Sequence, residues 1–218
     1  MKRINWKYAI GEIIIVIIGI TIAFSLNNIK ENRSNTDLKK QYLDNLAIDI
    51  EREIALLEEN ETKFNSKIKT TLQIQAFFRN PEITKRDSIS RKVFVLARLI
   101  NFTPQNTTYR TLVNSGDMKL IDNFDLRKSI EEHYSSHKNI LQDYQRIEKI
   151  NEKYLADFFI HKMDYTKIRS GNLDFLEDPL LKNIVSSMNG AYYIVLESGK
   201  KCLESNKRLL EEIKKEST

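Results

Sequence analysis

Two histidines, His133 and His137, are the residues of this chain whose type and spacing best suit metal binding. They lie four positions apart, next to Glu132, so that on a helix both imidazoles project from one face. His161 lies farther along the same expected helix. A glutamate three residues before a histidine, as diiron helical bundles use, does not occur in the sequence. We interpret His133 and His137 as polar positions on a helix seam or surface, keep a metal site as the alternative, and expect no cofactor.

Nucleophilic motifs are absent from the sequence. Ser115-Gly116-Asp117 lacks the glycine pattern of a nucleophile elbow, and no glycine-rich phosphate-binding loop occurs. Cys202 falls on an apolar helix seam and is the single cysteine, which excludes an intrachain disulfide. The sequence therefore predicts a protein that is not an enzyme.

The apolar stretch 8–26 is long enough to cross a bilayer, because a helix of this length measures about 28 Å against a hydrocarbon core of about 30 Å. Lys2, Arg3 and Lys7 precede it, whereas the basic residues that follow are interleaved with acidic ones. The positive-inside rule then predicts a cytoplasmic N-terminus and export of the remainder. The alternative is a cleaved signal peptide, because Ala23-Phe24-Ser25 has the small-x-small form of a cleavage site.

Three residues of this stretch are candidates for contacts within the membrane. Glu12 lies about one helical turn from the expected interface, so its carboxylate either reaches the headgroups or pairs with a base on a neighbouring helix. Gly19 and Ala23 form a small-xxx-small pair, which permits close packing of helices. The expected partners are therefore the lipid bilayer and either a second copy or another membrane or periplasmic protein.

Composition predicts an exported portion that is an ordinary helical protein. The chain has 35 Lys and Arg against 30 Asp and Glu, and three of the basic residues precede the apolar stretch, so we expect no nucleic-acid partner. Six Gly and three Pro in 218 residues favour long helices over sheet.

Hydrophobic spacing that alternates four and three predicts three long helices. The expected seams include Ile54, Glu61 and Gln75 in the first helix, Tyr154 in the second and Cys202 in the third. The first begins at a cap on Ser34 or Thr36 and ends at Asn80-Pro81, unless the polar patch 58–61 divides it. The second covers about 124–162, and the third starts at Asp178-Pro179 and ends near 215. Two shorter helices, at about 87–100 and 105–115, lie between the first and the second.

These elements predict an all-α fold: a single N-terminal transmembrane helix followed by an elongated antiparallel, four-helix-like bundle with polar layers in its interior. The expected divisions are a cytoplasmic N-terminus (1–7), the span (8–26), a juxtamembrane linker (27–35) and the exported bundle (36–218). In the connector before the second long helix, Gly116 is expected to be a left-handed helix stop and Asp122 or Asn123 a cap.

The chain resembles a family of uncharacterised single-pass membrane proteins seen mainly in Bacteroidetes-type bacteria. The resemblance rests on the opening Lys7-Tyr8-Ala9-Ile10-Gly11-Glu12, on Asn27-Asn28, and on the connector in which Tyr109, Leu112 and Gly116 recur. It implies a helical exported domain anchored in a Gram-negative inner membrane, and it implies no activity. Ile29 and Lys30 stand where the family often has aromatic residues, which weakens anchoring at the membrane exit.

Two functions are compatible with these features. The first is a non-catalytic interaction or scaffold protein that belongs to a membrane or envelope complex. The second is a ligand-sensing bundle, which would need a partner membrane protein, because the expected cytoplasmic part has only about seven residues. We favour the first.

Overall fold

The computed structural model describes residues 6–217, with side chains from Ile10 onward, and every regular element in this range is a helix. The N-terminal residues 1–5, which include Lys2 and Arg3, lie outside the described range. The principal helices are α1 (Trp6–Arg79), α2 (Arg86–Leu96), α3 (Thr107–Ser115), α4 (Phe124–Ile150), α5 (Ala156–His161), α6 (Tyr165–Arg169) and α7 (Pro179–Ser217). Short turns of 3-10 helix complete the set: η1 (Ile83–Lys85), η2 (Asp117–Leu120) and η4 (Asp174–Glu177).

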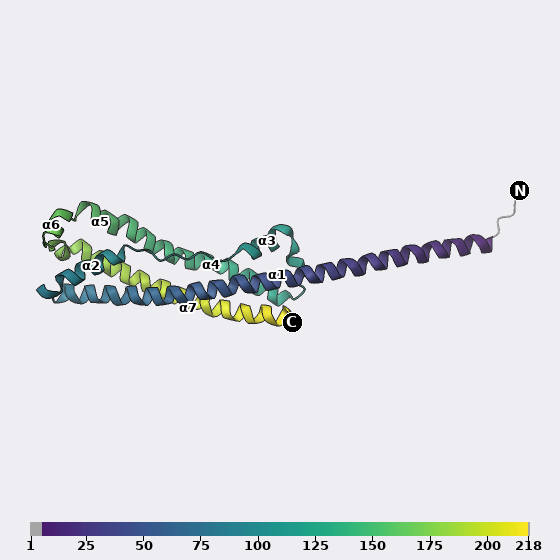
Figure 1. Cartoon of the computed structure of the whole chain (residues 1–218). Helices are drawn as coiled ribbons and strands as arrows, with labels where there is room; N and C mark the ends of the chain where they lie inside the picture. The colour runs from purple at the N-terminus through teal and green to yellow at the C-terminus, as the bar shows by residue number, and fades with distance from the viewer. Residues whose placement is uncertain (1–5, 218) are drawn as a thin grey trace.

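Helix α1 is one continuous rod of 74 residues whose N-terminal part projects beyond the rest of the molecule (Figure 1). The helix start expected at Ser34 or Thr36 is wrong, because the segment 27–35 is helical and the Thr36 hydroxyl donates back to the Asn32 carbonyl within α1. The patch 58–61 does not interrupt α1 either. The end before Pro81 is confirmed, since proline cannot follow a residue in helical geometry without a clash.

The chain then returns along α1 through residues 86–115, a partly helical segment that we call the returning limb. Helices α2 and α3 match the two short helices that the sequence predicts, but residues 97–106 between them are largely extended (Figure 1). Gly116 ends α3 with a φ of 74°, and the Asn123 side chain caps α4 by accepting from the Leu126 N–H at 3.1 Å. The predicted helix stop and the predicted cap are therefore both confirmed.

Helix α4 continues through a π-helical turn, η3 (Asn151–Leu155), directly into α5. A π turn inserts one extra residue into the helical repeat, so the buried face shifts by one position. Leu155 is accordingly buried, whereas Tyr154, which the regular spacing places on the seam, is exposed.

Helix α7 starts where Asp178 caps it, with the Leu180 N–H 2.8 Å from Asp178 Oδ1, and packs against both α1 and α4. Its C-terminus returns to the point where α1 leaves the bundle (Figure 1). There the Lys39 ammonium lies 2.7 Å from Glu216 Oε1, and Asn123 donates to the other oxygen of the same carboxylate.

The buried face of α1 keeps a three-four spacing, but half of it lies one position before the residues that apolar spacing selects. Ile54, Glu61 and Gln75 are only partly buried. Their places in the core are taken by the residues immediately before them. The buried series is Leu43, Leu46, Ile50, Glu53, Leu57, Asn60, Phe64, Lys67, Thr71 and Ile74, and Asp49, Ile68 and Phe77 are buried as well. At Ile54 and Glu61 the difference arises because Glu53 and Asn60 are polar yet buried.

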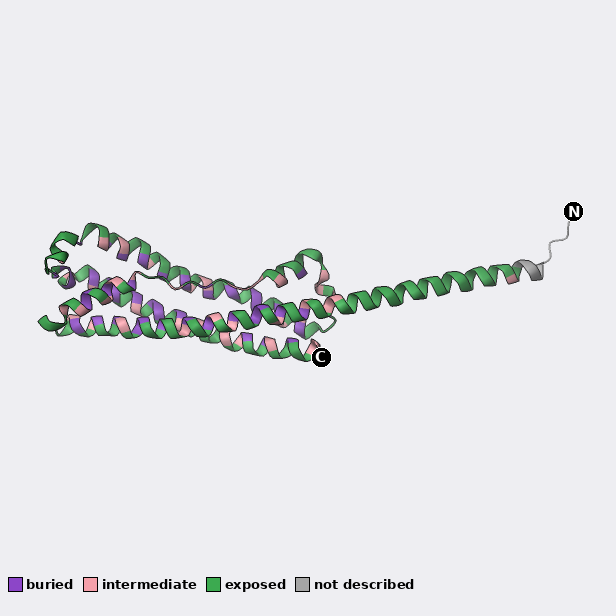
Figure 2. Cartoon of the chain, in the orientation of Figure 1, coloured by how far each residue is buried: buried purple, intermediate pink, exposed green. Residues whose placement is uncertain are grey.

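The hydrophobic interior is divided into two clusters. The one nearer the projecting end of α1 includes Leu46, Ile130 and Leu209, and the larger one includes Phe64, Phe158 and Tyr192. Between them lies a set of buried polar residues from three helices, which we call the interior polar layer: Glu53 of α1, His133 and His137 of α4, and Asn206 of α7. Figure 2 shows the contrast between this interior, which contains the buried residues, and the projecting part of α1, which is exposed.

Candidate functional site: the interior polar layer

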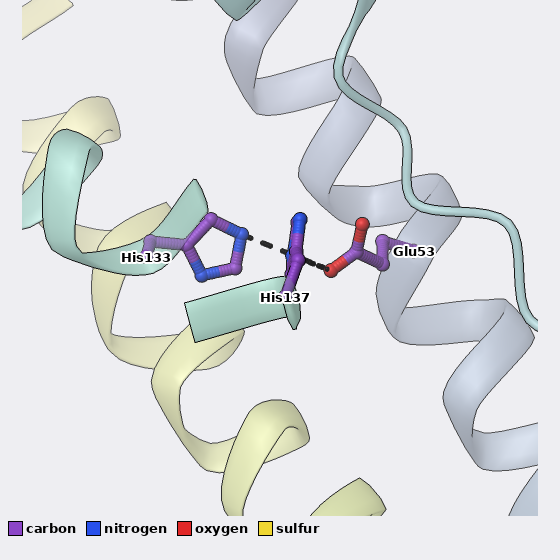
Figure 3. Close-up of side chains that lie close together, drawn as sticks. All are labelled: Glu53, His133 and His137. Atoms are coloured by element: carbon purple, nitrogen blue, oxygen red, sulfur yellow. Dashed lines mark hydrogen bonds and ion pairs between the residues drawn. The ribbon is translucent and has the colours of Figure 1, made fainter. Parts of the chain in front are cut away.

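The Glu53 carboxylate is the centre of the interior polar layer. Its Oε1 lies 2.8 Å from Nε2 of His137 and 3.7 Å from Nε2 of His133. One helical turn on α4 separates the two imidazoles, whose rings meet edge to face with centroids 4.6 Å apart (Figure 3). The three side chains are between 1% and 5% exposed, so the arrangement is closed to bulk water.

Two further hydrogen bonds fix the orientation of this carboxylate. Asn206 donates from Nδ2 to Oε1 at 3.1 Å, and the backbone N–H of Gln105 donates to Oε2 at 3.0 Å. The Cys202 thiol lies beside the same oxygen, with Sγ 4.0 Å from Oε1. Glu53 therefore connects α1 with α4, with α7 and with the extended segment 97–106.

Burial and these contacts change the proton affinities of the layer. Burial alone raises the pKa of Glu53, but the hydrogen bond and charge interaction with His137, with the bonds from Gln105 and Asn206, outweigh it and leave that pKa below its usual value. Burial, with the neighbouring His137, lowers the pKa of His133 to about 4. Burial also raises the pKa of Cys202 to about 12, so this thiol is protonated at neutral pH. At neutral pH the layer thus contains a carboxylate and a neutral His133, and a protonated thiol lies beside them.

His133 is incompletely bonded in this layer. Neither of its ring nitrogens has a hydrogen-bond partner, although both atoms are buried. The Oδ1 atom of Asn206 is in the same condition. A buried polar group without a partner costs about 1–3 kcal/mol, so the layer includes groups that a small polar ligand or ion would satisfy.

Other buried polar residues of α1 have a different role: they bind the backbone of the returning limb. Asp49 accepts from the N–H and the hydroxyl of Thr108 at the start of α3, with the hydroxyl oxygen 2.6 Å from Oδ2. Asn60 donates to the Asn101 carbonyl at 2.9 Å, and the Lys67 ammonium donates to the Arg98 carbonyl at 2.8 Å. Glu53 belongs to this series through its bond to Gln105, and its Oε1 is the atom that faces the histidines.

A surface groove of about 430 Å³ lies against one side of the layer. His137 and Tyr134 contribute to its lining from α4, and Tyr109 and Pro104 contribute from the returning limb. The two tyrosine rings stack with centroids 4.2 Å apart. His137 therefore belongs both to the groove and to the layer.

The sequence-predicted site residues fall in two places. His133 and His137 meet in the polar layer, whereas His161 is exposed and lies 3.5 Å from Asp157 of its own helix. Glu12 and Ala23 are exposed on the projecting part of α1, and a methyl group added at Gly19 would meet nothing within 4 Å. That part of α1 supplies the one helix in the described chain that is long and apolar enough to cross a membrane.

Glu53 is the residue that sequence reasoning missed. It stands next to the apolar seam rather than on it, and carboxylates at such positions are usually exposed. One signal was present: Leu46, Ile50, Glu53, Leu57 and Asn60 continue the three-four spacing without a gap. Its partner histidines lie about 80 residues away, at a distance that no local pattern reveals.

The layer can therefore do two things chemically. It can fix the register of three helices through directional hydrogen bonds, as buried polar groups do in other bundles. It also presents two imidazoles and one carboxylate, whose ligand atoms all lie within 4.8 Å of one another, and this donor set binds divalent transition metals.

Comparison with known proteins gives one match. No curated protein and no solved structure is significantly similar to the chain. The model of one protein family matches residues 12–154. This range contains Glu53, His133 and His137 and ends before α7. The resemblance to a family without a known activity is thus confirmed, while its membrane and bacterial aspects stay predictions. The match covers more than half of the chain, so the chain belongs to DUF6090, a family of unknown function.

Proposed function

We propose that this protein is a membrane-anchored helical interaction protein, a non-catalytic subunit or accessory of a membrane or envelope complex. The observation that carries the proposal is the continuity of α1: the exposed apolar segment and the buried seam belong to one helix without a linker. A bundle joined in this way has a fixed orientation relative to its apolar segment. Such a rigid connection suits a protein that holds a surface at a set position near a bilayer.

The proposed topology places the N-terminus in the cytoplasm, the apolar segment in the inner membrane, and an elongated antiparallel bundle of four limbs in the periplasm. Support comes from the basic residues before the span and from the unbroken exposed apolar stretch, which runs from Ile13 to Leu26 without a charge. In this arrangement α7 ends near the membrane, beside Lys39.

The non-catalytic part of the proposal is supported by the state of the most reactive groups. The Cys202 thiol is buried and its pKa is raised, so it is a poor nucleophile. The pKa of the buried Tyr192 hydroxyl is raised as well. Nucleophilic catalysis by such a group requires an accessible site and activation by a lowered pKa, an adjacent general base or a metal.

A ligand-sensing bundle is the second candidate, and one observation favours it. The surface groove shares His137 with a buried layer that includes unsatisfied polar atoms. A ligand bound there would contact α4 and the returning limb, and α1 would transmit any movement towards the membrane. A partner protein would still have to receive that signal.

Photo-crosslinking in intact membranes tests the two candidates. A photoreactive residue at Ile83, which is 87% exposed at the far end of the bundle, and another at Ile22, which is 55% exposed on the apolar segment, would sample both ends of the full chain. An interaction protein yields a discrete crosslinked product, and mass spectrometry identifies its second component as a membrane protein, a periplasmic protein or another copy. An uncrosslinked monomer that retains a small molecule through purification in mild detergent would contradict the first candidate and favour sensing.

A fusion of alkaline phosphatase after residue 217 tests the topology, because this reporter folds only in the periplasm. Activity is expected with the full chain. An inactive fusion that remains in the membrane fraction would contradict the orientation.

A further inference from the structure

The unsatisfied imidazole of His133 is the starting point for a separate inference about the interior polar layer. Its side chain is 1% exposed, and neither nitrogen has a hydrogen-bond partner, yet Nε2 faces Glu53 Oε1 at 3.7 Å. A neutral imidazole placed against a carboxylate without a bond between them lacks an obvious structural purpose. A cation between the two groups would supply one.

The three donor atoms have a separation that suits a single metal ion. Zinc binds imidazole nitrogen and carboxylate oxygen at about 2.0–2.2 Å, so neighbouring donors around it lie about 3–3.5 Å apart. The distances from Glu53 Oε1 to the two Nε2 atoms, 2.8 Å and 3.7 Å, bracket that range. All three ligand atoms lie within 4.8 Å of one another, so side-chain shifts of at most roughly 1.5 Å would bring each pair to the separation that a tetrahedral ion requires.

We propose that Glu53, His133 and His137 bind one divalent transition-metal ion, for which zinc is the best match, in the interior of the bundle. Two imidazoles and a carboxylate are borderline ligands, which favour zinc and its neighbours over calcium or magnesium. In the metal-free layer the His137 Nε2–H donates to Glu53. Metal binding requires the tautomer with the proton on Nδ1, and the metal then takes the place of that hydrogen bond.

The surroundings provide the outer contacts that such sites need. The Gln105 N–H and the Asn206 amide both donate to the Glu53 carboxylate and hold its orientation. The Cys202 sulfur lies 4.0 Å from Oε1, so a soft donor stands next to the proposed ion. Of the three proposed ligands, His137 also lines the surface groove, so this side chain is the one nearest to solvent.

The role of this ion would be structural. It would join α1 to α4 at the level where the two hydrophobic clusters are separated, and so replace an incompletely bonded layer with coordinate bonds. Because α1 continues into the apolar segment, the metal would also strengthen the attachment of α4 to the helix that contains that segment. This inference does not depend on the proposed interaction role.

Zinc titration of the full chain in detergent tests the proposal. The protein carries an affinity tag without histidine, is stripped with a chelator and is then titrated with zinc chloride against a colorimetric indicator. We expect one equivalent to bind with a Kd below about 1 µM. The melting temperature should rise by roughly 5–10 °C when free zinc is a hundredfold above that Kd.

Variants locate the bound ion. His133→Ala and His137→Ala are expected to weaken zinc binding at least about tenfold. His161→Ala removes the exposed histidine of the same helical rod and is the matched control, with unchanged affinity expected. Circular dichroism checks that each variant is folded.

X-ray absorption of the zinc-loaded wild type gives an answer that needs no variant. Two imidazoles in the coordination shell are expected. The proposal is overturned if the wild type binds no zinc below 10 µM, about ten times the expected limit, if His161→Ala abolishes binding while His133→Ala retains it, or if the spectrum includes no imidazole.

Discussion

His137 Nε2 and Glu53 Oε1 lie 2.8 Å apart in the middle of the bundle, although 84 positions separate the two residues in the sequence. Both side chains are at least nine-tenths buried, and each belongs to a different long helix. The pair therefore fixes the register of α4 against α1 at one level. The same carboxylate also accepts a hydrogen bond from the returning limb, so one side chain of α1 holds both α4 and the returning limb in place.

Removing the Glu53 carboxylate should destabilise the metal-free protein strongly. Glu53→Ala leaves His137, Asn206 and the Gln105 N–H without their acceptor, and disruption of a buried pair typically costs about 3–5 kcal/mol. Chemical denaturation in detergent with a chelator present measures the change. The matched control is Glu58→Ala: Glu58 pairs with Lys207 at the surface, so a change below about 1 kcal/mol is expected. Equal losses in the two variants would contradict this account of the layer.

Lys67 should make stability depend on pH in the alkaline range. Burial, with the charge of Arg98, lowers its pKa from 10.5 to about 8 in the folded protein. Between those two values the unfolded chain binds a proton that the folded chain has released, so Lys67 contributes a free energy of unfolding that rises with pH from about 8 towards 10.5. Above pH 9 the Cys202 thiol, whose pKa is raised from 9.0 to about 12, contributes in the opposite direction.

Denaturation at several pH values between 8 and 10, a window taken from the Lys67 values, measures this effect on the wild type. Lys67→Met should reduce the upward slope, and it should also destabilise the fold by about 1–3 kcal/mol at neutral pH, because the carbonyls at the end of α2 lose their donor. Lys69→Met, at an exposed site two positions away, should retain the wild-type slope. A slope that is the same in Lys67→Met and the wild type would show that this lysine does not cause it.

Two glycine substitutions should have opposite effects. Gly116 has a φ of 74°, so Gly116→Ala forces a side chain into left-handed geometry and should destabilise by about 1–2 kcal/mol. Gly190 lies in the middle of α7 with nothing within 4 Å of an added methyl group, so Gly190→Ala should stabilise by about 0.5–1 kcal/mol. Thermal unfolding followed by circular dichroism compares them. A stabilising Gly116→Ala would be incompatible with the helix stop.

Gly19 offers a test for a lateral partner in the membrane. An added β-carbon there meets nothing within 4 Å in the folded chain, so we expect a change in crosslinking in Gly19→Leu to come from another molecule. If Gly19 and Ala23 form a contact surface, Gly19→Leu should abolish crosslinking between copies or to a partner in membranes. Ile17→Leu, on the opposite face of the same helix, should leave crosslinking unchanged. Persistence of the crosslinked product in Gly19→Leu would eliminate this contact surface.

Most starts and ends of the helices were predictable because they depend on short-range chemistry. Asp178, Asn123, Gly116 and Pro81 act on neighbouring backbone groups through capping, left-handed geometry or steric exclusion, and all four do so at the expected places. The third long helix was also correct along its seam, since its buried positions are mostly apolar. The error at Tyr154 came from the π turn, which apolar spacing does not register.

The start of the bundle was not predictable in the same way. Ser34 and Thr36 are good capping residues, but a cap forms only where the chain leaves the helix, and here α1 continues because nothing around residues 27–35 bends it away. The helix break considered at 58–61 does not occur, because this polar patch has partners in the folded protein. Asn60 is buried and bonded to Asn101 and Tyr144, so this polar patch is a point of packing rather than of fraying.

The sequence by itself determined the helical class, the apolar N-terminal segment, the ends of most helices and the pairing of His133 with His137 on one face, because each depends on residues within a few turns of one another. Only the tertiary structure decided that Glu53 is buried and opposes those histidines. A carboxylate enters a core when distant groups, here Gln105, His137 and Asn206, together compensate for its lost hydration. That compensation depends on how three helices pack side by side, and no local spacing encodes it.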